Sequence, residues 1–236
     1  MTALPVAALS LWSAKPLHLD LLLADWAFAR DLARGCDPAQ QARTARFARA
    51  ILATRWADAD EVLLVGHSLG AVFVVQALAE ALRQDPNLLR TTPPLALVGL
   101  GSSVLKVALL PGAARLRADL SLLARSAGFE WVELASRRDV LSFERSGPLG
   151  PLGIAGHGPR LESVHPRDMV NGATWGRIRW RFLRLHRQYV LGNEQRYFWD
   201  FGLAVCGPLP MGGTRPDRAL GPDGALNSAA IACRAA

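Results

Sequence analysis

The stretch EVLLVGHSLGAVFVVQALAEAL, residues 61–82, places a glycine-flanked serine between two apolar segments. Residues 62–65 form a continuous apolar run, which is typical of a strand covered on both faces. Beyond Gly70 the apolar residues recur at steps of three or four, which predicts a helix that stops at Asp85 and Pro86. The stretch therefore predicts a strand, a tight turn and a helix.

The turn itself, Gly66, His67, Ser68, Leu69 and Gly70, fits the G-x-S-x-G nucleophile elbow. In that motif the serine occupies a strained turn and points outward, while the glycines let the strand and the helix approach each other. The alternative is an ordinary strand-to-helix turn in which Ser68 caps the helix. The buried-looking strand before the motif and the amphipathic helix after it favour the elbow.

With these residues the sequence resembles the α/β-hydrolase superfamily, whose esterases and lipases often carry G-H-S-x-G. Three further segments, LLLADWAFARDLARG (21–35), the region of Asp139 and RFLRLHRQYVLGN (181–193), are similar to a group of bacterial α/β-hydrolases, some of which have membrane-spanning segments. The resemblance covers residues 20–210 and specifies a superfamily, not a substrate.

Strand-like and helix-like segments alternate after the elbow. Residues 95–101 and 129–135 read as buried strands, residues 113–127 have helical spacing, and the glycine- and proline-rich residues 147–159 read as a long loop. We therefore expect an α/β fold with a doubly wound, mostly parallel sheet of α/β-hydrolase type. Ser102 and Ser103 should lie at the same sheet edge as Ser68.

A serine nucleophile needs a base and a carboxylate that orients the base, and in this fold they follow in the order serine, acid, histidine. Asp139 comes just after the strand 129–135, and the resembling family also places its acid in an S-x-x-D turn. Glu133 falls inside the strand, and Glu144 and Asp168 fit less well. Asp139 could also be a simple turn-forming aspartate.

Five histidines compete for the role of base. His186 is preferred because it matches the basic, aromatic H-x-Q-Y segment of the resembling family, and His157 in the predicted loop comes next. His165 is the third candidate, His18 precedes the serine, and His67 belongs to the elbow, where it shapes the pocket. The alternative for His186 is a position on a basic surface helix beside an apolar stripe.

The oxyanion hole should use the backbone N–H of Leu69, the residue after the nucleophile. A second donor normally follows an early strand, but residues 1–60 contain helix-like segments at 19–34 and 39–56 and no convincing strand with such a loop. Residues 4–12 alone could pair with the elbow strand. Either the chain is an N-terminally shortened member of the family, or a helical segment substitutes for the missing part. We expect a sheet that lacks the early strands, an exposed elbow strand, and weak or no esterase activity.

Composition limits the remaining possibilities. The 236 residues, 50% of them hydrophobic, suit one domain over residues 1–206, helical over 1–60 with the elbow at 61–83, followed by a poorly ordered tail at 207–236. The net charge is +7, and 25 of the 27 basic residues are arginine, spread along the chain except in RIRWRFLRLHR (177–187). That segment favours a solvated helix face or contact with a membrane surface over nucleic-acid binding.

Cys36, Cys206 and Cys233 are odd in number and form no C-x-x-C pair, which indicates a reduced compartment. We find no signal peptide, no membrane span, and no motif for a metal or a cofactor, so we expect a chain in the cytoplasm or on the cytoplasmic membrane face. The sequence predicts a serine hydrolase that cleaves small-molecule or lipid carboxylic esters through an acyl-enzyme on Ser68. Alternatives are a catalytically silent hydrolase-fold protein that serves as a binding or membrane-associated module, and an acyltransferase.

Overall fold

The fold is described from a computed structural model, which covers residues 18–56, 58–207 and 210–211. Four parallel strands form the central layer: β1 (Val62–His67), β2 (Leu95–Leu100), β3 (Phe129–Ala135) and β4 (Arg160–Ser163). They lie in the order β1-β2-β3-β4. The three expected strands and the parallel sheet are confirmed, and β4 adds a strand that the sequence analysis did not anticipate.

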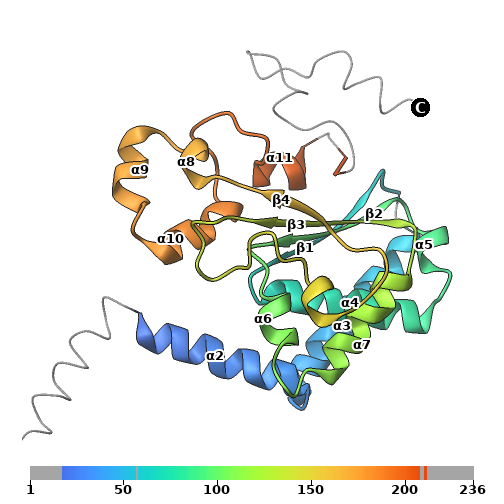
Figure 1. Cartoon of the computed structure of the whole chain (residues 1–236). Helices are drawn as coiled ribbons and strands as arrows, with labels where there is room; N and C mark the ends of the chain where they lie inside the picture. Colours follow the sequence, from blue (N-terminus) through green and yellow to red (C-terminus); the bar gives the residue numbers. More distant parts are fainter. Residues whose placement is uncertain (1–17, 57, 208–209, 212–236) are drawn as a thin grey trace, which may run out of the picture.

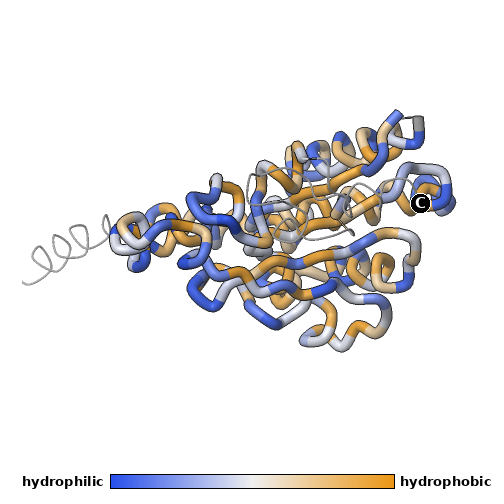
Figure 2. The backbone as a smooth tube through the Cα atoms, turned by 90° about the horizontal axis from the view of Figure 1, so that it is seen from above, coloured by the Kyte–Doolittle hydropathy of each residue, from blue (hydrophilic) through white to orange (hydrophobic). Residues whose placement is uncertain are grey.

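Helices cover both faces of this sheet, so the chain has an α/β architecture (Figure 1). Most side chains of β1, β2 and β3 are apolar, which suits strands covered on both faces, whereas β4 is short and polar and its Arg160 and Leu161 are exposed. In Figure 2 apolar segments run through the middle of the molecule. β2 is buried along its whole length, whereas β1 lies at the edge of the four strands and is only half-buried.

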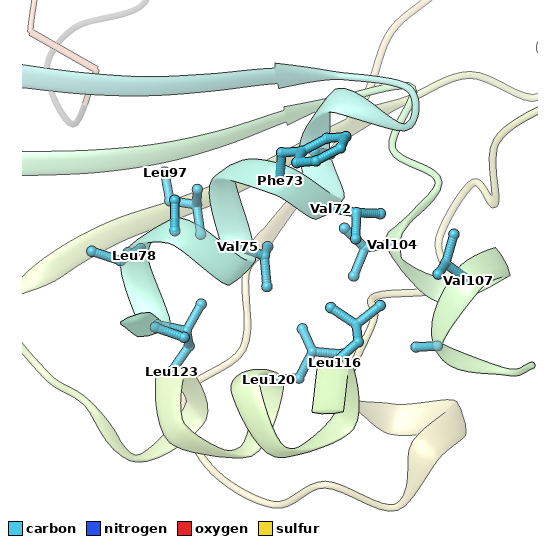
Figure 3. Packing of buried hydrophobic residues seen from close by; sticks show 14 of the residues in the cluster. Val72, Phe73, Val75, Leu78, Leu97, Val104, Val107, Leu116, Leu120 and Leu123 are labelled. Carbon is cyan, nitrogen blue, oxygen red and sulfur yellow. The ribbon is translucent and has the colours of Figure 1, made fainter. Parts of the chain in front are cut away.

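The first face carries the larger hydrophobic cluster, centred on α4 (Gly70–Gln84). Val72, Val75 and Leu78 of this helix pack between the sheet and Leu116, Leu120 and Leu123 of α7 (Ala114–Arg125), as Figure 3 shows. This layer is completed by α2 (Leu19–Arg34), α3 (Pro38–Ala53), η1 (Thr54–Trp56), α5 (Leu88–Thr91) and α6 (Val104–Ala108).

The second face is covered by short helices from the last part of the described chain. These are α8 (Pro166–Met169), α9 (Gly172–Ile178), α10 (Phe182–His186), η3 (Arg187–Val190) and α11 (Phe201–Cys206). Buried Val98 and Val132 of the sheet pack in one cluster with Leu185, Tyr189 and Trp199. The helical spacing noted around His186 is therefore divided among three short helices.

The segment before β1 matches the expectation of two helices, since α2 and α3 occupy most of residues 18–56 and this range contains no strand. Residues 4–12, the predicted partner of the elbow strand, lie outside the described residues. Within the described residues no strand pairs with the outer edge of β1. At the start of that strand, the Met211 N–H donates to the Glu61 carboxylate at 3.0 Å.

A long connection joins β3 to β4 over residues 136–159, and its one regular element is η2 (Gly150–Leu152). The predicted loop at 147–159 lies within it. Cys36 and Cys206 are free and exposed, while Cys233 and nearly all of the tail 207–236 lie outside the described residues. In the described ranges, every helix is too short or too polar to cross a membrane.

Candidate active site

Ser68 lies in the tight turn between β1 and α4, with a φ of 56° that residues other than glycine rarely adopt. The Ser68 N–H donates to the Leu100 carbonyl at 3.0 Å, and the Ser103 N–H donates to the Ser68 carbonyl at 3.1 Å. These bonds tie the turn to the end of β2, which holds the left-handed backbone in place. Ser103 therefore lies beside Ser68, as expected.

The two glycines of the turn differ in their surroundings. A Cβ on Gly66 would lie 2.7 Å from both the Ala71 N and the Val74 Cγ2, so only glycine lets β1 and α4 approach this closely. A Cβ on Gly70 would meet nothing within 4 Å. The expectation that both glycines make room for the helix is correct for Gly66 and wrong for Gly70.

Asp139 and His186 form a buried pair, although they are far apart in the sequence. His186 Nδ1 lies 2.8 Å from Asp139 Oδ2, and both side chains are buried. Asp139 is held in the turn after β3, where its N–H donates to the Ser136 carbonyl at 3.0 Å. Because an ionised carboxylate only accepts hydrogen bonds, Nδ1 carries a proton, and in the neutral ring Nε2 then carries the lone pair.

His186 Nε2 is buried and has no hydrogen-bond partner in the described part of the chain, so it makes no hydrogen bond with Ser68 Oγ. The ring of His186 nevertheless lies beside the elbow, since its centroid is 4.6 Å from that of the His67 ring. The structure thus brings Asp139 and His186 to the Ser68 turn, with a basic nitrogen left unpaired. The alternative of a surface position for His186 is excluded by its burial.

The Asp139 carboxylate accepts two further hydrogen bonds, from the Tyr189 hydroxyl to Oδ2 and from the Leu141 N–H to Oδ1, each at 3.0 Å. Burial by itself would raise the pKa of Asp139, but the hydrogen bond and charge of His186 and the other donors outweigh burial and lower that pKa. Burial and the charge of Asp139 raise the pKa of Tyr189, which remains a protonated donor.

Gly101 makes space for these groups at the carboxyl end of β2. Its φ is 51°, and a Cβ there would lie 2.7 Å from Tyr189 Cε2, 3.0 Å from Asp139 Oδ2 and 3.2 Å from His186 Cε1. A side chain at this position would push the Asp139 and His186 side chains apart.

The His67 ring is engaged with the backbone of His186. Its Nε2 donates to the His186 carbonyl at 2.9 Å, and burial lowers the pKa of its ring, which keeps it neutral. The remaining histidines, His18, His157 and His165, are exposed. No hydrogen bond between described residues joins any of these three to Asp139.

The other candidate acids lie elsewhere as well. Glu144 accepts from Ser163 Oγ at 2.9 Å, and Asp168 is exposed in α8. Glu133 is buried in β3, where its carboxyl fills the space left by the missing side chain of Gly99 in β2. Burial raises the pKa of Glu133 to about 7. The carboxyl borders a cavity of about 250 Å³ lined also by Ser102, Leu105 and Phe143.

Leu69 precedes the first residue of α4, and its N–H makes no hydrogen bond with another described residue. It is thus a free donor next to Ser68, at the positive end of a 15-residue helix. In the described ranges no group of three or more His, Cys, Asp or Glu side chains could hold a metal ion.

No protein-family model, curated protein or solved structure matches the chain. The site therefore has to be interpreted from its own geometry.

Two residues of the site were not identified from the sequence. Tyr189 ends the H-x-Q-Y segment that was noted only for His186, although it follows His186 by three residues and so points to the same side of a helical turn. Gly101 ends the predicted strand 95–101, a position where a glycine can indicate a close approach of neighbouring groups. No sequence pattern at either position indicates a contact with Asp139.

Proposed function

We propose that the chain is a serine hydrolase of carboxylic esters, of α/β-hydrolase type, with Ser68 as nucleophile, His186 as base and Asp139 as the carboxylate that orients it. The observation that carries the proposal is the buried Asp139–His186 pair beside the strained Ser68 turn, with the His186 Nε2 lone pair unpaired. The resemblance of the elbow segment to esterases and lipases supports the same chemistry.

The reaction follows from the protonation states. Ser68 Oγ attacks the ester carbonyl carbon while its proton passes to His186 Nε2, and the ring becomes a cation that the ionised Asp139 stabilises. The tetrahedral intermediate collapses, the C–O bond to the alcohol breaks, and His186 returns the proton to the leaving oxygen. Water then attacks the acyl-enzyme, His186 takes the proton of the water, and the acid is released as Ser68 recovers its hydrogen.

The Leu69 N–H is the proposed first donor to the developing oxyanion, assisted by the amino end of α4. The first step requires Ser68 Oγ to reach His186 Nε2. Rotation of the Ser68 side chain together with a small shift of α10 supplies this contact when an ester occupies the site, since catalytic hydrogen bonds often tighten only on substrate binding.

Two observations favour a second candidate, a catalytically silent protein that binds esters or membranes through the same fold. Ser68 Oγ and His186 Nε2 make no hydrogen bond, and residues 18–56 contain no strand that could end in a second oxyanion loop. The two candidates differ in whether Ser68 is acylated by an ester and then released by water.

Hydrolysis of p-nitrophenyl esters of graded acyl length tests the proposal. We expect Ser68→Ala to abolish turnover, and Asp139→Asn and His186→Gln to lower kcat by about a thousandfold or more. Ser102→Ala is the matched control, because this serine lies at the end of the neighbouring strand, and it should keep most of the activity. Release of p-nitrophenol that persists in Ser68→Ala contradicts the proposal. Faster release with an added alcohol, with transfer of the acyl group to it, indicates an acyltransferase.

A further inference from the structure

The amino-terminal half of α2 extends beyond the helical layer that its other half packs against (Figure 1). Leu19, Leu23 and Trp26 belong to one helical stripe that continues to Ala29 and Ala33, and only the last two are buried. Leu23 is 69% exposed and Trp26 is 55% exposed. The apolar stripe of α2 therefore continues where no described part of the chain covers it.

A second unusual surface lies on α9 and α10 and the turns that follow each of them. Five arginines occur within eleven residues, and in the described structure none of them forms an ion pair with a carboxylate: Arg177, Arg179, Arg181, Arg184 and Arg187. Trp180 stands among them with 78% of its surface exposed, and the Arg179 guanidinium lies 5.6 Å from its ring centroid. The Glu194 carboxylate has an electrostatic interaction with Arg177 and with Arg184.

The two surfaces meet at the start of α2. The His18 ring contacts the Phe182 ring edge-on, with centroids 6.1 Å apart. A hollow of about 440 Å³ lies at this junction, lined by His18, Trp180, Arg181, Phe182, Arg184 and Arg187. Cationic side chains thus surround an opening beside exposed leucine and tryptophan side chains.

We propose that this combined surface, the amino-terminal half of α2 together with residues 177–187, docks on a membrane that carries anionic lipids. Arginine forks match phosphate geometry, so Arg181, Arg184 and Arg187 bind lipid phosphate groups in the hollow. Trp180 and Trp26 lie at the level of the headgroups, and Leu19 and Leu23 enter the boundary of the acyl chains. Charge complementarity selects this occupant, because arginines that form no ion pair in the described structure adjoin the apolar residues, and a purely apolar partner would bring no anion to them.

This docking does not depend on the chemistry proposed for Ser68. It places α10, which carries His186, beside the lipid surface.

Flotation of the full chain with vesicles tests the proposal. We expect binding to phosphatidylcholine vesicles that contain about one-third phosphatidylserine, and little binding to phosphatidylcholine alone, with the difference reduced by salt. The triple variant Arg179→Gln, Arg181→Gln, Arg187→Gln should partition less by about fivefold for each arginine, or roughly 100-fold in all. Leu23→Gln with Trp26→Gln should also weaken binding, because it removes the apolar contact while keeping good helix formers.

Matched controls separate the surface from overall charge and hydrophobicity. The triple variant Arg46→Gln, Arg49→Gln, Arg125→Gln removes the same charge from exposed positions elsewhere, and Phe47→Gln with Val140→Gln removes exposed apolar side chains elsewhere. Both controls should bind anionic vesicles like the unchanged chain.

Three results would overturn the proposal. The first is the absence of flotation with anionic vesicles. The second is an equal loss of binding in the control variants. The third is a Leu23→Gln, Trp26→Gln variant that binds vesicles normally but unfolds at a lower temperature or dissociates from a dimer, which would assign the stripe to this chain's own remaining residues or to a second copy.

Discussion

Asp139 was a candidate acid from its place in the sequence, and in the structure its carboxylate lies at the centre of the hydrogen bonds of the site. Three donors converge on its carboxylate, from His186, Tyr189 and Leu141, and Gly101 leaves the space in which they do so. The position of Asp139 after a strand was sufficient to select it, because the order of elements along the chain restricts where an acid can lie. Its contacts with Gly101 and Tyr189 were not predictable, since these residues follow β2 and lie in η3 and approach Asp139 only after the sheet has formed.

Gly101→Ala tests this packing. The added Cβ at a φ of 51° would meet the Tyr189, Asp139 and His186 side chains, so we expect a loss of about 1–3 kcal/mol in the free energy of unfolding. Ester hydrolysis should fall by about a hundredfold, because small displacements of catalytic groups are costly. Urea denaturation and kcat/KM provide the two measurements, and a variant with unchanged activity would mean that the pair does not act in catalysis.

Asp139→Asn should reveal the lowered pKa of the carboxyl through stability. A carboxyl whose pKa is lower in the folded state stabilises the fold above its unfolded pKa, and this stabilisation is lost as pH falls through the folded pKa. We expect the variant to be less stable by about 2 kcal/mol at neutral pH, where the wild-type carboxylate receives its hydrogen bonds. The difference should shrink below about pH 4 in urea titrations, and a difference that does not change with pH would contradict the assignment.

At the scale of elements, the turn from β1 to α4 was predictable because its signals are local. The apolar run, the glycines and the helical spacing all lie within residues 61–82, and the structure places β1, the turn and α4 there. β4 was not predictable, since its four residues, two exposed and two partly buried, carry no strong strand pattern and depend on pairing with β3. The same applies to α9, α10 and η3, whose breaks depend on packing against the second face of the sheet.

Comparison of Gly66→Ala with Gly70→Ala isolates the close approach of this strand and helix. A Cβ at Gly66 would press on the backbone of Ala71, so we expect destabilisation of about 3 kcal/mol or more. At Gly70 the space is open, and alanine should be neutral or stabilise the helix by up to about 1 kcal/mol. Thermal and urea unfolding of both variants will show the contrast, and similar effects at the two positions would disprove the steric explanation.

For the whole molecule, the sequence predicted a mostly parallel sheet, because strand-like segments rich in apolar residues alternate with helix-like segments. It did not predict which polar groups the two layers bury. Glu133 was recognised only as a strand residue, and its burial results from its register opposite Gly99 on the neighbouring strand. Such a pairing depends on contacts between distant segments and leaves no periodic signal.

Glu133 should therefore make the whole fold sensitive to pH. Burial raises its pKa from an ordinary value near 4.5 to about 7. A raised carboxyl pKa means that the folded state keeps a proton that the unfolded state releases, so stability falls as pH rises from about 4.5 to 7 and stays lower above that range. The loss is on the order of 3 kcal/mol.

Glu133→Gln keeps the shape of the side chain and removes its titration, so it should abolish most of this decline. Urea midpoints of the wild type and the variant at about pH 5 and about pH 8 make the comparison. We expect the variant to gain stability relative to the wild type at the higher pH, and equal pH dependence in both proteins would show that Glu133 is not the titrating group.

The central claim is that Ser68 is an activated nucleophile beside the Asp139–His186 pair. The most direct measurement is reaction of the chain with a fluorophosphonate, followed by digestion and mass spectrometry of the modified peptide. We expect one adduct on Ser68, absent in Ser68→Ala and strongly slowed in His186→Gln, while Ser102→Ala reacts like the unchanged chain. A chain that remains unmodified while folded, or an adduct on another residue, would contradict it.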